Sequence, residues 1–102
     1  MSEKVKLCSV ADLLEGEMVS YTVNNFPIAA TKIGNNVFAV EDMCSHAKCS
    51  LSEGLIENES IVCPCHGAAF DLNTGEPLNP PAKKPIKTYG VLVDGESLYI
   101  KL

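Results

Sequence analysis

The chain has 102 residues, of which 46% are apolar and 21% are charged, with a net charge of −5. This length and composition predict one compact domain, residues 1–102, and argue against global disorder. All eight cationic residues are lysines without a basic stripe, so we expect no nucleic-acid binding. No apolar run reaches the roughly 18 residues of a membrane span, and the N-terminus lacks a signal-peptide segment. We therefore expect a soluble, cytoplasmic protein with no membrane span.

Short apolar runs separated by turn residues occur along most of the chain, a pattern typical of β-strands. The first strand is predicted around Val5 and Leu7, and one helical turn at 10–14. Further strands are predicted at 18–23, 26–33, 37–40, 55–56, 61–62, 88–93 and 97–102. Asp94-Gly95 is a strong hairpin signal between the last two. The prediction is an all-β fold of nine or ten short antiparallel strands, barrel-like or sandwich-like, with little helix.

Three stretches do not have the pattern of strands. Residues 43–54 and 63–69 contain four of the five cysteines and both histidines, and 76–85 is rich in proline. The first two stretches each follow a β-rich pair of runs, so both are expected at hairpin tips on one side of the molecule. A packed core does not need such clustering of cysteine and histidine, whereas a metal site does.

The first of these loops contains Cys44-x-His46, and the second contains Cys63-x-x-His66. Two thiolates and two imidazoles suit a [2Fe–2S] cluster with both thiolates on one iron and both imidazoles on the other. They also suit a tetrahedral zinc ion. The one-residue gap of the first pair is awkward for a single tetrahedral ion, so the spacing favours the cluster and leaves zinc as the alternative.

The sequence resembles a Rieske-type ferredoxin over nearly its whole length. Both halves of that family's ligand motif are present, and so is much of the surrounding sequence. The matching positions are Gly54, His66-Gly67, Phe70-Asp71, Thr74-Gly75-Glu76 and Pro80-Pro81. The resemblance implies a Rieske-like fold in which two loops form a cluster-binding subdomain, approximately residues 42–73, with the proline-rich stretch covering the cluster.

The resemblance also implies the ligand set and the function. Cys44 and Cys63 would hold the inner iron of a [2Fe–2S] cluster, and His46 and His66 the outer iron. The expected function is a soluble one-electron carrier between a flavin-dependent reductase and a terminal oxygenase, without catalytic residues of its own. The alternatives are a small Rieske subunit of another redox complex, such as a nitrite-reductase-like assembly, and a zinc-stabilised interaction module.

Two cysteines of the loops, Cys49 and Cys65, lie outside the ligand motif. In the respiratory and photosynthetic members of the family, cysteines at these positions form a disulfide, so the resemblance implies a Cys49–Cys65 disulfide here. The competing interpretation is two free thiols, which a reducing cytosol favours. Cys8 lies far from the loops in sequence and is expected to be a small buried side chain.

The residues after His66 bear on the reduction potential. High-potential relatives have a serine and a tyrosine whose hydroxyls donate hydrogen bonds there, whereas this chain has Ala68 and Phe70. Neither side chain donates a hydrogen bond. Since such donors stabilise the reduced cluster, we predict a potential toward the bottom of the Rieske range of about −150 to +300 mV.

Overall fold

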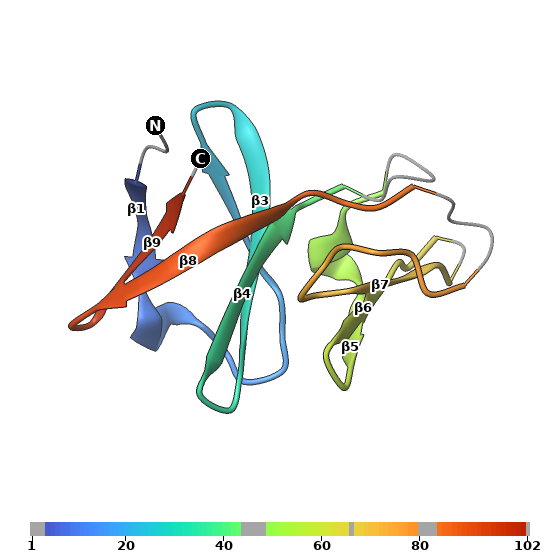
Figure 1. Ribbon diagram of the computed structural model, residues 1–102, viewed down its shortest axis with the longest axis horizontal. Coiled ribbons are helices and arrows are strands. Elements are labelled where there is room, and N and C mark those ends of the chain that lie inside the picture. The colour runs from blue at the N-terminus through green and yellow to red at the C-terminus, as the bar shows by residue number, and fades with distance from the viewer. Residues whose placement is uncertain (1–3, 44–48, 66, 80–83, 102) are drawn as a thin grey trace.

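The computed structural model describes residues 4–43, 49–65, 67–79 and 84–101 (Figure 1). Within these ranges it has nine strands in two antiparallel sheets, which confirms the all-β prediction. The larger sheet has the order β1-β9-β8-β4-β3-β2, and the smaller has the order β5-β6-β7. The strands are β1 (Lys4–Ser9), β2 (Val19–Val23), β3 (Phe26–Ile33), β4 (Asn36–Glu41), β5 (Leu55–Glu57), β6 (Ser60–Val62), β7 (Ala69–Asp71), β8 (Thr88–Asp94) and β9 (Ser97–Lys101).

Two hairpins of the larger sheet follow from local turn chemistry. Asn24 and Asn25, between β2 and β3, both have positive φ angles, 50° and 68°. Two consecutive left-handed residues give the twist that a tight hairpin needs, and asparagine tolerates this conformation. Between β8 and β9, Gly95 has a φ of 63°, and Asp94 pairs with Ser97. The hairpin predicted at Asp94-Gly95 is therefore confirmed.

The smaller sheet belongs to a long excursion of the chain between two neighbouring strands, β4 and β8. These strands pair through Ala39 with Tyr89 and Val40 with Thr88. Just beyond the pairing, the Glu41 backbone N–H donates to the Lys87 carbonyl oxygen at 2.9 Å. Residues 43–87 thus leave and rejoin the larger sheet at adjacent points, and in Figure 1 the smaller sheet lies to one side of it.

Strand alternation gives β3 and β4 two buried faces. On β3, Ala29 packs in one hydrophobic cluster while Ile28 and Ala30 pack in another. On β4, Val40 and Ala39 divide between the same two clusters in the same way. Since successive side chains of a strand point to opposite faces, these central strands separate two cores. One core is formed mainly by side chains of the larger sheet. The other lies between the larger sheet and residues 43–87.

The structure differs from the sequence prediction in two short elements. Strand β7 begins at the end of the loop predicted over 63–69, and it pairs with β6 through Ile61 and Phe70. A 3-10 turn, η2 (Leu51–Glu53), lies inside the loop predicted over 43–54. The helical turn predicted at 10–14 is confirmed as a shorter 3-10 turn, η1 (Val10–Asp12). Among the described residues, no helix is long and apolar enough to span a membrane.

Candidate metal centre

Cys63 is the predicted ligand that falls within the described residues. It follows β6, is 1% exposed, and is a free thiol. Its backbone is held on both sides, because its N–H donates to the Ala68 carbonyl oxygen at 2.6 Å and its own carbonyl oxygen accepts from the Gly67 N–H at 3.1 Å. Gly67 has a φ of 71°, which favours glycine at this point. The second loop is therefore a closed turn that fixes the Cys63 backbone at the edge of the core.

The other three predicted ligands, Cys44, His46 and His66, lie outside the described residues. Their loops are nevertheless bracketed by residues that the structure describes. The first loop runs from Met43 to Cys49, and the second includes Cys65 and Gly67 on either side of His66. Within the described residues, Cys49, Cys63 and Cys65 therefore show how the two loops are joined.

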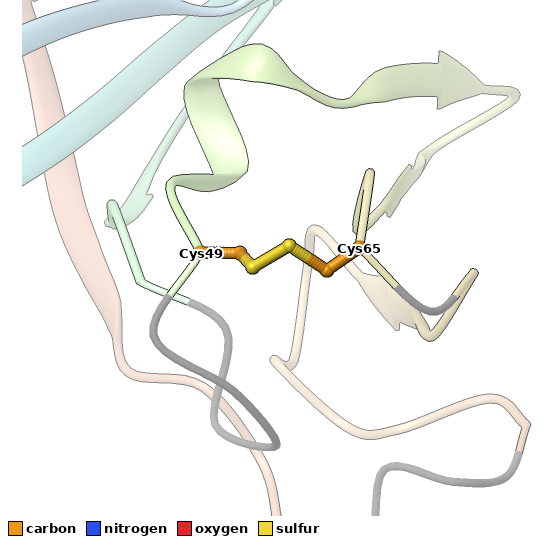
Figure 2. The surroundings of a disulfide bond; sticks show 2 residues. All are labelled: Cys49 and Cys65. Atoms are coloured by element: carbon orange, nitrogen blue, oxygen red, sulfur yellow. A yellow bond between two sulfur atoms is a disulfide. The ribbon is translucent and has the colours of Figure 1, made fainter.

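A disulfide joins the two loops. Cys49 and Cys65 are bonded across a Cα–Cα distance of 6.4 Å, which confirms the disulfide that the family resemblance implied (Figure 2). Figure 2 shows the bond linking the segment before η2 to the turn after β6. Cys49 is half-buried and Cys65 is exposed. The disulfide thus holds the end of the first loop against the middle of the second.

The three sulfur atoms of Cys49, Cys63 and Cys65 lie within 4.8 Å of one another. The free thiol of Cys63 is consequently a direct neighbour of the disulfide. The predicted motif has one ligand pair on each of the two joined loops, and Cys63 is the member that the structure describes.

A buried carboxylate, Asp42, fixes the base of the first loop. It lies two residues before Cys44 and is 5% exposed. One carboxylate oxygen accepts from the Ser52 N–H at 2.6 Å, and the other accepts from the Ser52 hydroxyl at 2.7 Å and the Ser20 hydroxyl at 3.1 Å. Hydrogen bonds to an ionised acceptor are the stronger kind. Asp42 therefore ties the start of the loop to η2, which follows the loop, and to β2.

Asn79 connects the proline-rich stretch to the second loop. Its Oδ1 accepts from the Ala69 N–H at 2.7 Å, and its Nδ2 donates to the Gly67 carbonyl oxygen at 3.3 Å. The Leu78 N–H donates to the Ala69 carbonyl oxygen at 2.8 Å. The predicted covering of the cluster by residues 76–85 falls partly outside the described residues, but its first part is bound to the ligand loop.

Sequence reasoning did not identify Asp42 or Asn79. Asp42 follows a strand and resembles an ordinary acidic residue at a strand end, because its partners Ser20 and Ser52 are distant in sequence. A buried-carboxylate role becomes apparent only when the burial and the three donors are known. The sequence signal for Asn79 was weak, since it was only a hydrogen-bonding residue next to Pro80-Pro81.

The two positions that bear on the reduction potential are both enclosed. Ala68 and Phe70 are each 0% exposed and belong to the same hydrophobic cluster as Cys63. Their side chains carry no hydrogen-bond donor. The low potential stays a prediction, and it rests on these apolar surroundings, because burial without donors disfavours the added charge of reduction.

Cys8 lies apart from this centre, in the core of the larger sheet. It is 8% exposed and free, as predicted for a small buried side chain. Burial, together with the nearby Asp12, raises the pKa of the Cys8 thiol against the lowering effect of a hydrogen bond with Tyr21. Burial and the Cys8 contact likewise raise the pKa of the Tyr21 hydroxyl. Both groups therefore stay protonated at neutral pH.

Comparison with known proteins agrees with this geometry. The family model of the Rieske [2Fe-2S] domain matches residues 3–90. The ferredoxin subunit of 3-phenylpropionate/cinnamic acid dioxygenase from Escherichia coli (strain K12) is 40% identical over 101 residues, which cover 97% of this chain and 93% of that protein.

Two solved structures show the same fold. A ferredoxin in complex with a reduced oxygenase, from carbazole 1,9a-dioxygenase, superposes with a TM-score of 0.88 at 34% identity, covering 95% of this chain and 91% of that one. A putative small subunit of an NADPH nitrite reductase superposes with a TM-score of 0.84 at 28% identity, covering 96% and 97%. The chain therefore belongs to the Rieske [2Fe-2S] domain family, as an electron-carrying ferredoxin with a [2Fe-2S] cluster rather than an enzyme in its own right.

Proposed function

We propose that this ferredoxin accepts single electrons from a flavin-dependent reductase and delivers them to a terminal oxygenase in the cytoplasm. The observation that carries the proposal is the 40% identity to a dioxygenase ferredoxin subunit over 97% of the chain. The similarity to a ferredoxin solved in complex with an oxygenase supports the acceptor half of the proposal. The reductase half rests on the chemistry of the carrier, which needs a one-electron donor.

We further propose that Cys44 and Cys63 bind one iron of the cluster and that His46 and His66 bind the other, in a subdomain of approximately residues 42–73 within a single domain. The described residues fit such a group. Cys63 offers a buried free thiol, and the disulfide holds together the two loops that carry the four donors. The cluster supplies reversible one-electron chemistry when bound, and the chain supplies two ligand-bearing loops that a disulfide joins.

The ligand assignment is tested by metal analysis and electron paramagnetic resonance of the purified protein. We expect iron and acid-labile sulfide in equal amounts and, after reduction, the low average g value of an imidazole-ligated cluster. His66→Cys replaces one imidazole by a thiolate and should raise that average g value. A colourless protein that contains zinc would contradict the assignment and support the interaction-module alternative.

The partner assignment is tested by reconstitution. The holoprotein is combined with the reductase and oxygenase components of the 3-phenylpropionate system, and NADH-dependent product formation is measured with and without it. We expect turnover that depends on the ferredoxin concentration and is absent with cluster-free protein as the matched control. A stable complex with a nitrite reductase large subunit, together with no oxygenase turnover, would favour the second candidate, which the 28% identity to a nitrite reductase small subunit supports.

A further inference from the structure

The proposed iron ligand Cys63 lies beside a disulfide, and the electron-carrier function does not use this contact. The Cys63 sulfur and the two sulfurs of the Cys49–Cys65 bond lie within 4.8 Å of one another. Thiol–disulfide exchange requires a thiolate that reaches a disulfide sulfur, and this distance leaves only a small side-chain movement.

We propose that Cys63, when it holds no iron, attacks the neighbouring disulfide and exchanges it within the chain. The Cys63 sulfur forms a bond to the Cys49 sulfur, the Cys49–Cys65 bond breaks, and Cys65 leaves as a thiolate that takes up a proton from water. The proton that Cys63 loses balances the one that Cys65 gains. One disulfide and one thiol are present before and after, so the step needs no oxidant or reductant.

Burial and exposure favour Cys65 as the leaving group. Cys65 is exposed, so water solvates its thiolate, whereas Cys63 is 1% exposed and Cys49 is half-buried. The alternative product would join Cys63 to Cys65 across a single intervening residue, Pro64. That bond would close a small ring around Pro64, whose side chain fixes its φ, so we take the Cys49–Cys63 bond as the product.

Hydrogen bonds fix the backbone of Cys63 and leave its side chain free to make this movement. Hydrogen bonds join Cys63 to Ala68 and Gly67, and these contacts do not involve the side chain. The exchanged bond closes a loop only two residues shorter than the 16-residue separation of the original one. Because loop closure depends weakly on length, the two disulfides should be similar in chain entropy.

The exchanged disulfide would act as a latch, meaning that it would block reloading of the cluster. This part rests on the proposed role of Cys63 as an iron ligand. In the holoprotein, iron would occupy the Cys63 sulfur and prevent the exchange. In the cluster-free chain, the exchanged bond would remove one ligand until a dithiol reductant restores it. A chain that has lost its cluster would then stay empty without a source of thiol.

The test is to find which cysteine is free before and after the cluster is removed. Holoprotein is treated anaerobically with an iron chelator and without thiol reagents, quenched in acid, unfolded, and alkylated with N-ethylmaleimide. Protease cleavage after Glu53, Glu57 and Glu59 separates Cys49 from Cys63 and Cys65, and mass spectrometry then locates the label and the disulfide-linked peptides.

We expect Cys65 to be unlabelled in quenched holoprotein and labelled in roughly half of the cluster-free chains, which then also contain a Cys49–Cys63 link. Cluster-free protein in which the label stays on Cys63 and Cys65 is unlabelled would overturn the proposal. Cys63→Ser is the matched control and should leave Cys65 unlabelled. The wild-type comparison does not depend on the folding of that variant.

Reloading the cluster tests the latch independently of the assignment of the cluster ligands. Cluster-free protein supplied with iron and sulfide should regain about twice as much cluster after treatment with a dithiol as without it. Equal recovery despite a labelled Cys65 would overturn the latch. A protein that never contains iron would contradict the proposed function, whereas the exchange is still measurable in that chain.

Discussion

The six-stranded sheet and the three-stranded sheet differ in strand length and in the source of their buried residues. The larger sheet has strands of five to eight residues and a core formed by its own side chains together with Leu13. The strands of the smaller sheet have three residues each, and their buried side chains share a core with Ala29 and Val40 of the larger sheet. The short strands therefore depend on the larger sheet for part of their core, and the larger sheet supports the cluster loops.

The largest effect is expected from truncating the shared core. Phe70 is fully buried between the two sheets, and Phe70→Ala should lower the free energy of unfolding by about 3–5 kcal/mol. Because Phe70 is in the same cluster as Cys63, cluster content should also fall. Leu98→Ala, in the other core, is the matched control. Urea unfolding and iron content of both variants measure the difference, and equal iron loss in the two would contradict the division into two cores.

A close backbone contact at Gly54 should have the next largest effect. A Cβ at this position would collide with the Val62 carbonyl oxygen, although the backbone conformation itself suits any residue. Gly54→Ala should therefore destabilise the protein by about 1–3 kcal/mol through overpacking. Gly90→Ala is the control in the larger sheet, because its new methyl group would meet only the flexible Lys101 side chain. Thermal unfolding that is equal for the two variants would disprove the steric explanation.

Removing the Asp42 carboxylate, at the base of the first loop, should lower the free energy of unfolding by a similar or smaller amount. Asp42→Ala leaves the Ser52 N–H without its 2.6 Å acceptor, which should cost about 1–3 kcal/mol. Ser20→Ala removes only the 3.1 Å contact from an exposed residue and should cost less than half as much. Denaturant unfolding measures both variants. A Ser20 variant as unstable as the Asp42 variant would show that the loop contacts are not the main contribution.

The reduction potential should respond to one added hydroxyl. Ala68→Ser places a donor beside Cys63, and a hydrogen bond of about 0.5–1.5 kcal/mol to a cluster or ligand sulfur corresponds to a rise of about 20–60 mV. Ala68→Gly alters the same position without a donor and should leave the potential within about 10 mV of the wild type. Protein-film voltammetry gives both values. An unchanged potential in the serine variant would mean that its hydroxyl does not reach a sulfur.

The smallest effect on the free energy of unfolding is expected from a change of pH, through two groups in the core of the larger sheet. The pKa of Cys8 and the pKa of Tyr21 are both raised on folding from ordinary values of 9.0 and 10.0. Above those values the unfolded chain loses protons that the folded chain retains, so the free energy of unfolding should be constant below about pH 9 and fall above it. Tyr21→Phe should reduce this fall. Denaturant unfolding of the holoprotein between pH 7 and 11 tests it, and an equal slope in the variant would contradict the role of Tyr21.

The two regions also differ in how well the sequence predicts them. In the larger sheet, alternating runs and turns such as Asn24-Asn25 and Asp94-Gly95 predict the hairpins, because the signals are local. In the excursion, β7 was missed because three residues within a cysteine loop give no periodic pattern. Its pairing depends on contacts of Ile61 with Phe70. The Cys49–Cys65 disulfide was predictable, since the family resemblance is carried by the sequence itself, and the ligand set stays a prediction.

The contacts of Asp42 show why the rest was not predictable. Its three hydrogen bonds come from Ser20 and Ser52, 22 and 10 residues away. Such a contact exists only after β2, β4 and η2 have assembled, and no single segment contains a signal for it.

The excursion between β4 and β8 also has a kinetic consequence. Val40 and Thr88 pair only after the whole intervening segment has been closed into a loop, whereas the β2–β3 and β8–β9 hairpins need only short turns. Closing a long loop costs conformational entropy before the pairing contacts form, and this slows folding. The hairpins should therefore form early, and the β4–β8 seam late. Formation of that seam would place the two cluster loops on the larger sheet, so that the metal-binding end of the molecule is the last part to acquire its native geometry.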